Sequence, residues 1–203
     1  MKKIITIGRQ FGSGGRELGR RLAEELGFEY YDKEIVAEIA KRTSLSESYV
    51  RSVVECKPHQ LYPITIGKSI AYVGDYQFTQ MQSVYQAQDS IMKDLADKSD
   101  CVIVGRCADY ILREQSPYRI FVYADLASRL QRCLARAEEG EDITEKEMKQ
   151  RINEIDKGRS KYYDFYTGQK WGASQNYDLL VNTSDKEIKG LVKGLAAMLK
   201  EIL

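Results

Sequence analysis

Four small residues stand together near the start of the chain: Gly12, Ser13, Gly14 and Gly15. They follow the apolar run "IITI" and precede a helical pattern. The backbone N–H groups of such a turn can converge on an anion, and the dipole of the following helix favours negative charge at the same place. The segment therefore predicts a phosphate or nucleotide site. A glycine turn that serves only tight packing of strand against helix is the alternative interpretation.

The usual phosphate-binding pattern, G-x-x-x-x-G-K-[ST], is only partly present. That pattern supplies a lysine to the β- and γ-phosphates and a hydroxyl group to magnesium. With Gly12 and Gly14 aligned to it, Arg9 replaces the first glycine, Gly15 the lysine and Arg16 the hydroxyl residue. A cation in the first turn of a helix opposes the dipole by about 0.3–1 kcal/mol. Arg9 and Arg16 are therefore expected to face an anion or carboxylates.

Glu17 lies in the same first turn and belongs to the predicted nucleotide-binding segment. It stands four residues before Arg21, a spacing that allows a surface ion pair on a helix. Such a pair accounts for Arg21 but leaves Arg9 and Arg16 to the anion.

The elements that would position this loop alternate between strand and helix. The expected strands are 4–7, 28–31, 101–104, 120–123 and 179–181. The expected helices are 16–26, 33–41, a short helix after a capping box at 44–47, 77–96, a helix capped by Asp125, a helix from Thr144 to about 163, and one from 188 onward. Strands separated by helices of this length predict right-handed crossovers, and hence a three-layer α/β fold with helices on both faces of a parallel sheet.

Two segments fit the sheet poorly and are predicted to close over a ligand. Residues of about 43–76 form a helical substrate-binding insertion, and residues of about 137–174 form a lid. Together with the core they make one domain over residues 1–203. The aromatic residues of the second segment could stack on a base or pack the lid onto the core.

Composition excludes several classes of function. With 31 basic and 30 acidic residues the net charge is +1, so nothing in the overall charge favours nucleic acid or a membrane surface. The four cysteines show no C-x-x-C pair and there is one histidine, which argues against structural zinc and a disulfide framework. A cytoplasmic location is expected, and the aromatic residues leave room for a homo-oligomer.

Three blocks carry a resemblance to a known family. "ITIGRQFGSGGRELGRRLAEELGFEYYDKEIV", "CVIVGRCADYIL" and "YYDFYTGQKWG" with "NYDLLVNTS" occur in that order. In this the chain resembles the cytidylate kinase-like family, a divergent branch of the P-loop nucleoside monophosphate kinases, over essentially its whole length. The resemblance implies a P-loop NTPase-type sheet, ATP as phosphoryl donor and magnesium as cofactor. The magnesium ligands are not identified: with Arg16 in place of the hydroxyl residue, magnesium would need a ligand from elsewhere, and Ser13 and a water held by an acid are the candidates.

The resemblance also implies residues that contact the acceptor. Arg106 ends a buried strand, like an arginine that contacts the monophosphate in relatives; a salt bridge to a neighbour is the alternative. Asp109 is the nearby acid, displaced from the position that Cys107 holds here. Asp32 corresponds to a residue that borders the monophosphate site, and it could equally cap the helix that starts at Lys33.

In relatives a lid helix swings arginines over the phosphates. Arg151, Asp156 and Arg159 match that spacing loosely, with Asp156 as a substrate-binding residue, and a solvated charged helix is the alternative. With Arg16 reaching the β- and γ-phosphates, Arg16, Arg106, Arg151 and Arg159 would form the catalytic set. Kinases of this kind act by placing two phosphates and neutralising their charge, so no general base is needed.

The function that follows is phosphoryl transfer from ATP to a nucleoside monophosphate, with CMP or dCMP as acceptor. Two other functions stay open because the lysine is missing and the acceptor segment departs from the cytidylate pattern. One is a catalytically weak or inactive nucleotide-binding or anion-binding protein. The other is a kinase for another small-molecule acceptor.

Overall fold

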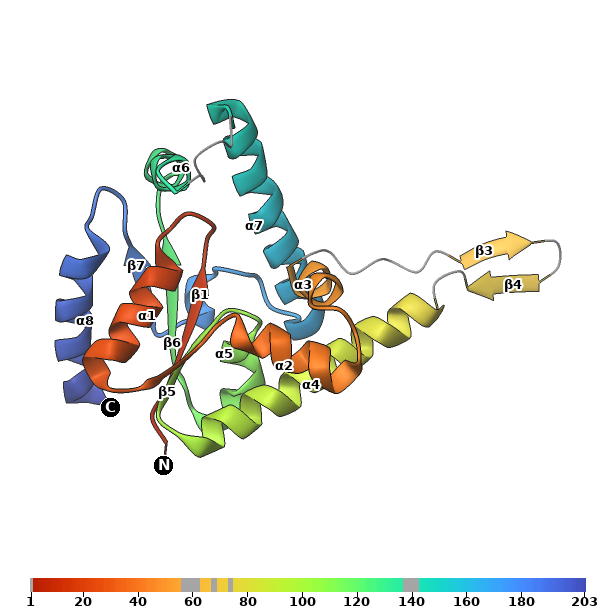
Figure 1. The fold of residues 1–203 in the computed structure, drawn as a ribbon, viewed down its shortest axis with the longest axis horizontal. Helices are drawn as coiled ribbons and strands as arrows, with labels where there is room; N and C mark the ends of the chain where they lie inside the picture. The colour runs from red at the N-terminus through yellow and green to blue at the C-terminus, as the bar shows by residue number, and fades with distance from the viewer. Residues whose placement is uncertain (1, 56–62, 67–68, 73–74, 137–142) are drawn as a thin grey trace.

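A five-stranded parallel sheet forms the centre of the molecule (Figure 1). The computed structural model describes residues 2–55, 63–66, 69–72, 75–136 and 143–203. The strand order is β2-β5-β1-β6-β7, with bounds β1 Ile4–Arg9, β2 Glu29–Tyr31, β5 Cys101–Val104, β6 Tyr118–Tyr123 and β7 Leu179–Asn182. The chain continues from β1 toward β2 on one side of the sheet and from β6 toward β7 on the other. Ligands of open α/β sheets bind beyond the carboxyl ends of strands at such a crossing point.

Helices cover both faces of this sheet (Figure 1). Helices α1 (Gly15–Leu26) and α8 (Ile188–Ile202) pack on one face over a core of buried aliphatic side chains. The other face is covered by α2 (Glu34–Thr43), α3 (Glu47–Glu55), α4 (Asp75–Lys98), α5 (Ala108–Ile111) and α7 (Glu145–Thr167). The prediction of a three-layer α/β fold is thereby confirmed, and so are its five strands, with β1 and β6 each two residues longer than expected.

Helix α6 (Leu126–Leu134) packs against α7 beyond the carboxyl ends of the strands (Figure 1). Leu130 of α6 forms a small buried cluster with Met148 and Ile152 of α7, and Phe11 packs against it. Phe11 belongs to the loop after β1, so this cluster links the loop to both helices.

The helix ends follow local capping chemistry. Asp125 caps α6 by accepting a hydrogen bond from the Ser128 N–H at 2.7 Å. Thr144 and Glu147 form the predicted capping box of α7. The capping box predicted from Ser44 is wrong, because Ser44 adopts a left-handed conformation (φ 55°) that ends α2. Ser46 takes its place and accepts the Tyr49 N–H at 3.3 Å.

The segment of about 43–76 contains α3, the antiparallel strands β3 (Pro63–Ile66) and β4 (Ser69–Tyr72), and the start of α4. Neither of these two strands joins the main sheet. Residues 137–142 of the predicted lid lie outside the described residues, as do Cys56 and His59. Two single 3₁₀ turns, Arg113–Gln115 and Ser174–Asn176, complete the structure described.

None of the helices, over the residues described, combines the length and apolar character needed to cross a membrane. Cys101, Cys107 and Cys133 are all free thiols. In the same part of the chain no group of three or more His, Cys, Asp or Glu side chains is arranged to hold a metal ion.

Replacing Ile152 by alanine should lower the free energy of unfolding by about 2–5 kcal/mol, because this fully buried side chain joins α7 to α6. Urea unfolding followed by circular dichroism measures the loss. Lys149→Ala removes an exposed side chain from the same helix and should change the free energy by less than about 0.5 kcal/mol. Equal effects of the two substitutions would mean that the cluster does not anchor α7.

Candidate functional site

The loop after β1 turns sharply through its glycines. Gly12 and Gly14 both have φ of 77°, and Gly14 is the N-cap residue of α1. The first N–H groups of a helix have no partner within the helix, so this end of α1 can bind an anion. The Ser13 hydroxyl donates to the Gln10 carbonyl at 2.8 Å and accepts the Gly15 N–H at 3.4 Å. Ser13 is fully buried, so its hydroxyl stabilises the turn rather than facing a ligand.

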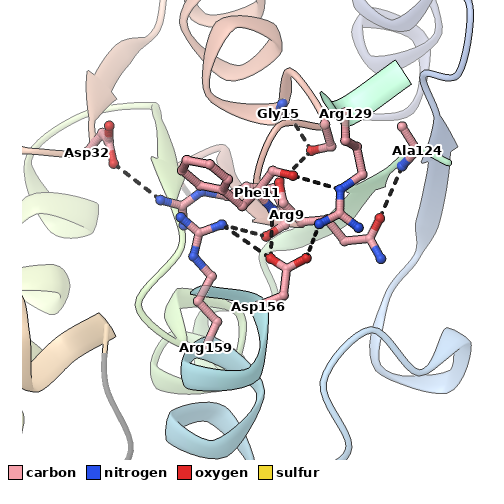
Figure 2. Close-up of polar contacts among 10 residues, drawn as sticks. Arg9, Phe11, Gly15, Asp32, Ala124, Arg129, Asp156 and Arg159 are labelled. Atoms are coloured by element: carbon pink, nitrogen blue, oxygen red, sulfur yellow. Dashed lines mark hydrogen bonds and ion pairs between the residues drawn. The ribbon is translucent and has the colours of Figure 1, made fainter. Parts of the chain in front are cut away.

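Side chains from distant parts of the chain hold this loop from behind (Figure 2). Asp156 of α7 accepts the Phe11 N–H at 2.7 Å and forms an ion pair with Arg129. The Arg129 Nε donates to the Phe11 carbonyl at 2.7 Å. The Thr183 hydroxyl donates to the Ser13 carbonyl at 2.7 Å. Asp156, which was predicted to bind substrate, therefore acts through the loop and is not among the residues that line the cleft described below.

Asp32 is the centre of a buried charge cluster. Its side chain is 3% exposed and contacts three arginines: Oδ2 lies 2.5 Å from the Arg16 Nε, while Oδ1 lies 3.5 Å from the Arg106 Nη1 and 3.6 Å from the Arg9 Nη2. The Arg106 Nη1 also donates to the Asp32 carbonyl at 2.7 Å. The alternative that Asp32 caps α2 is wrong, since Lys33 is the N-cap residue and no side chain caps that end.

The positive charge of Arg9 is only partly balanced, because the single carboxylate of Asp32 is shared by three arginines. Burial, followed by repulsion from Arg159, lowers the pKa of Arg9, and Asp32 opposes that effect. Arg159 itself donates to the Arg9 carbonyl at 3.3 Å, and its guanidinium lies over the Phe11 ring, 5.6 Å from the centroid. Guanidinium groups stay protonated in proteins, so a bound anion would relieve this cluster.

Arg106 follows β5, as predicted, and is held from below by α4. Gln88 is fully buried and donates from Nε2 to the Arg106 carbonyl at 2.9 Å. The Tyr162 hydroxyl donates to the Gln88 Oε1 at 3.3 Å. The side chain of Gln88 is therefore committed to positioning Arg106 and is turned away from a ligand.

A cleft of about 630 Å³ opens in front of the loop. Among the described residues that line it are eight arginines, one lysine and no carboxylate; the cations are Arg9, Arg16, Lys33, Arg51, Arg106, Arg132, Arg136, Arg151 and Arg159. Gly12, Gly14 and Gly15 line the same cleft. The predicted glycine loop and all five predicted arginines thus meet in one place, and the charge of the place is strongly positive.

Four of these cations were missed from the sequence: Lys33, Arg51, Arg132 and Arg136. Arg132 lies in the last turn of α6 and Arg136 follows the end of that helix, and their spacing of four residues in a helical pattern is a signal that the sequence contains. Arg51 lies on α3, inside the predicted insertion, and its approach to the loop depends on the tertiary fold. Glu17 does not line the cleft; it pairs with Arg21 at 3.0 Å and also with Arg136.

A smaller pocket of about 40 Å³ lies next to the cleft. Arg106, Asp109, Tyr163, Trp171 and Tyr177 are among its lining residues. The Tyr163 hydroxyl donates to the Asp109 Oδ2 at 2.6 Å. Burial raises the pKa of Asp109, partly offset by this hydrogen bond. Tyr163 and its neighbour Tyr162 pack into the core, which is the second of the two interpretations of these aromatic residues.

Comparison with known proteins finds relatives over most of the chain. The model of the cytidylate kinase-like family matches residues 4–185. The chain is 26% identical over 191 residues to a protein named cytidylate kinase from Methanopyrus kandleri, covering 89% of this chain and 84% of that protein. Its fold is similar to an uncharacterized protein from Eubacterium ventriosum (TM-score 0.71, 25% identity, 98% and 99% of the two chains). It is also similar to shikimate kinase from Bacteroides thetaiotaomicron (TM-score 0.58, 14% identity, 98% of each chain), a likeness of fold alone.

The substitution Asp32→Asn should lower the free energy of unfolding by about 3–5 kcal/mol, because it leaves buried arginines without their carboxylate. Thermal melts measure the loss, and inorganic tripolyphosphate should raise the melting temperature of this variant more than that of the wild type. Asp94→Asn removes an exposed partner of Arg42 and should cost less than about 1 kcal/mol. A variant as stable as the wild type would contradict a central role for Asp32.

Asp109→Asn should stabilise the protein increasingly as the pH rises from about 4 to 7. The pKa of Asp109 is raised in the folded state, so folding binds extra protons, and the stability contribution of this group falls between its unfolded pKa of about 3.9 and its folded pKa. The difference in free energy of unfolding between variant and wild type, measured by urea titration across this range, isolates the group. A difference that stays constant with pH would contradict the raised pKa.

Proposed function

Because the chain belongs to the cytidylate kinase-like family, we propose that it transfers a phosphoryl group from ATP to a phosphorylated acceptor, with CMP and dCMP as the first candidates. The observation that carries the proposal is the cleft in which eight arginines and a lysine meet the glycine loop. Phosphoryl transfer asks little of a protein beyond positioning two substrates and neutralising their oxygens. The cations and the glycine loop of this cleft could both position the two substrates and neutralise their charge.

The distribution of the cations supports two bound phosphate groups. Arg51, Arg106 and Lys33 come from the side of the sheet formed by β2 and β5. Arg132, in α6, and Arg136, just after the end of α6, come from the opposite side of β1. A monophosphate brings a charge of about −1.5 to −2 at pH 7. We therefore assign the acceptor phosphate to the first group and the donor phosphates to the glycine loop.

Helix α7 brings further cations to the cleft. It supplies Arg151 and Arg159 to the cleft, and Arg159 also contacts the loop through the Arg9 carbonyl. A lid of about residues 137–174 and the insertion of about 43–76 would close over the substrates and exclude water from the reacting phosphates. Within one domain, both segments would then contribute cations to the transition state.

The nucleophile needs no general base, because an acceptor phosphate oxygen is already ionised at pH 7. Arg106 would orient that oxygen, held in turn by Gln88 and by the Asp32 carbonyl. The arginines of the cleft would neutralise the charge that spreads over the oxygens of the transferred group. Proton transfer is absent from this step.

Magnesium fits the described residues poorly as a protein-held ion. The Ser13 hydroxyl is buried in the turn, Asp32 is engaged by arginines, and no carboxylate is among the described residues that line the cleft. Magnesium binds through phosphate oxygens and water where protein carboxylates are few. We propose that any magnesium ion arrives on the nucleotide, and no step is assigned to a protein-bound ion.

One competing function is favoured by the glycine at position 15, where the usual pattern has a lysine. It is a nucleotide-binding protein that transfers the phosphoryl group slowly or not at all. Removing a group that stabilises the transition state reduces rates by a factor of about 100–1000. Calorimetry would then detect ATP binding while no acceptor turns over. The two proposals differ in turnover alone, so one assay separates them.

A coupled assay of ADP release with ATP, magnesium and each nucleoside monophosphate tests the proposal. Turnover of about 1–100 per second is expected with at least one monophosphate. Shikimate is included as an acceptor that carries no phosphate, and no turnover is expected with it. Turnover with shikimate alone would replace the acceptor class. Binding of ATP without turnover of any acceptor would favour the non-catalytic function.

Arg106→Lys should reduce kcat/KM for the acceptor by a factor of about 100, since a lysine cannot keep the paired contacts of a guanidinium. Nucleotide affinity measured by calorimetry should change little. Arg20→Ala is the matched control, because Arg20 is exposed on α1 and pairs with Glu24. If Arg106→Lys behaves like this control, Arg106 does not contact the acceptor.

A further inference from the structure

The side chain of Arg9 occupies the space in which a side chain at position 15 would begin. A Cβ built on Gly15 would lie 2.6 Å from the Arg9 Cβ and 3.2 Å from the Arg9 Cγ. The backbone does not demand glycine here, because Gly15 is the first residue of α1 and is not among the glycines with positive φ. Glycine at position 15 is therefore explained by the room that Arg9 needs.

A second glycine accommodates the far end of the same side chain. A Cβ built on Gly105 would lie 1.6 Å from the Arg9 Nη1 and 2.7 Å from the Arg9 Cζ. The guanidinium thus lies directly on the backbone at the carboxyl end of β5. Figure 2 shows it extending from the loop toward Asp32. Gly15 and Gly105 together form a slot across the edge of the sheet, and Arg9 fills it.

Arg9 and Arg16 differ in how firmly they are held. The Arg9 side chain is 10% exposed, and its backbone carbonyl is bound by Arg159. The Arg16 side chain is 49% exposed and is tied to Asp32 through its Nε. A group that stabilises a transition state must be fixed before the reaction begins. Of the two, Arg9 meets that requirement.

We propose that Arg9, and not Arg16, replaces the missing lysine and contacts the transferred phosphoryl group. The proposal rests on the kinase function proposed above. In the transfer, the bond from the γ-phosphorus to the bridging oxygen breaks, and ADP leaves with its electron pair. An oxygen of the acceptor phosphate forms the new bond to phosphorus. Arg9 donates N–H bonds to the oxygens of the moving group and neither gains nor loses a proton.

The two positions can be exchanged, and this exchange is the test. Arg9→Gly empties the slot, Gly15→Lys introduces the usual lysine against Arg9, and the double variant restores the G-x-x-x-x-G-K pattern. In the double variant the Val122 Cβ would lie 3.2 Å from the new Cβ, a contact relieved by a shift of a few tenths of an ångström. Arg9→Lys keeps the charge and most of the volume, and Arg20→Ala is the exposed control.

Calorimetric titration with ATP and the coupled assay are run on every variant that melts cooperatively. Arg9→Gly should lower kcat by a factor of about 100–1000. Gly15→Lys alone should lower it at least as much, because the two side chains collide. The double variant should regain at least a factor of about ten over Arg9→Gly. If Arg9→Gly does not fold, Arg9→Lys carries the test, with a loss of at least a factor of about ten expected.

The outcomes separate this inference from the proposed function. A wild type that binds no ATP overturns both. A wild type that turns over, with Arg9→Gly and Arg9→Lys unchanged, overturns the role of Arg9 alone. A wild type that binds ATP without turnover is judged by ATP affinity: a loss of at least a factor of about ten in Arg9→Gly supports the contact, and an unchanged affinity overturns it. Additive losses in the double variant also overturn the exchange.

Discussion

The carboxylate of Asp32 and the arginines around it assemble the site from separate parts of the fold. Arg9 ends β1, Arg16 lies in the first turn of α1 and Arg106 follows β5, and all three reach the same buried side chain. Guanidinium groups brought together in a poorly solvated place repel one another unless a negative charge is present. Asp32 supplies that charge before any ligand arrives, so the cations are already in place when an anion enters the cleft.

The glycine loop is likewise held by polar contacts within the protein. Its inward-facing groups are satisfied by the protein: Asp156 and Arg129 bind Phe11, and Thr183 binds Ser13. What remains for a ligand is the outward side, at the N-terminus of α1 and beside the arginines. Groups that are held rigidly before a substrate binds need no rearrangement during the reaction, which is the main electrostatic means by which proteins lower a barrier.

The cleft contains far more positive charge than one phosphate requires. The chain is similar in fold to shikimate kinase from Bacteroides thetaiotaomicron, so the fold does not specify the acceptor. The charge of the cleft is more informative than the fold. Cations lie on both sides of the loop, which supports the proposal of two phosphorylated ligands. At the altered position of the loop, the side chain of Arg9 from the preceding strand lies across the place where a lysine at position 15 would start.

The sequence by itself determined the layers of the fold, the glycine loop and the arginine after β5, because hydrophobic periodicity and the positions of glycines at turns are local signals. It could not determine which arginine to propose in place of the lysine. Proximity along the chain pointed to Arg16, whereas the path of Arg9 depends on Gly105, which reaches β1 only when β5 pairs beside it. The partners of Asp32 and Asp156 were hidden for the same reason: contacts between residues distant in sequence are decided by packing, and packing exists only in the folded chain.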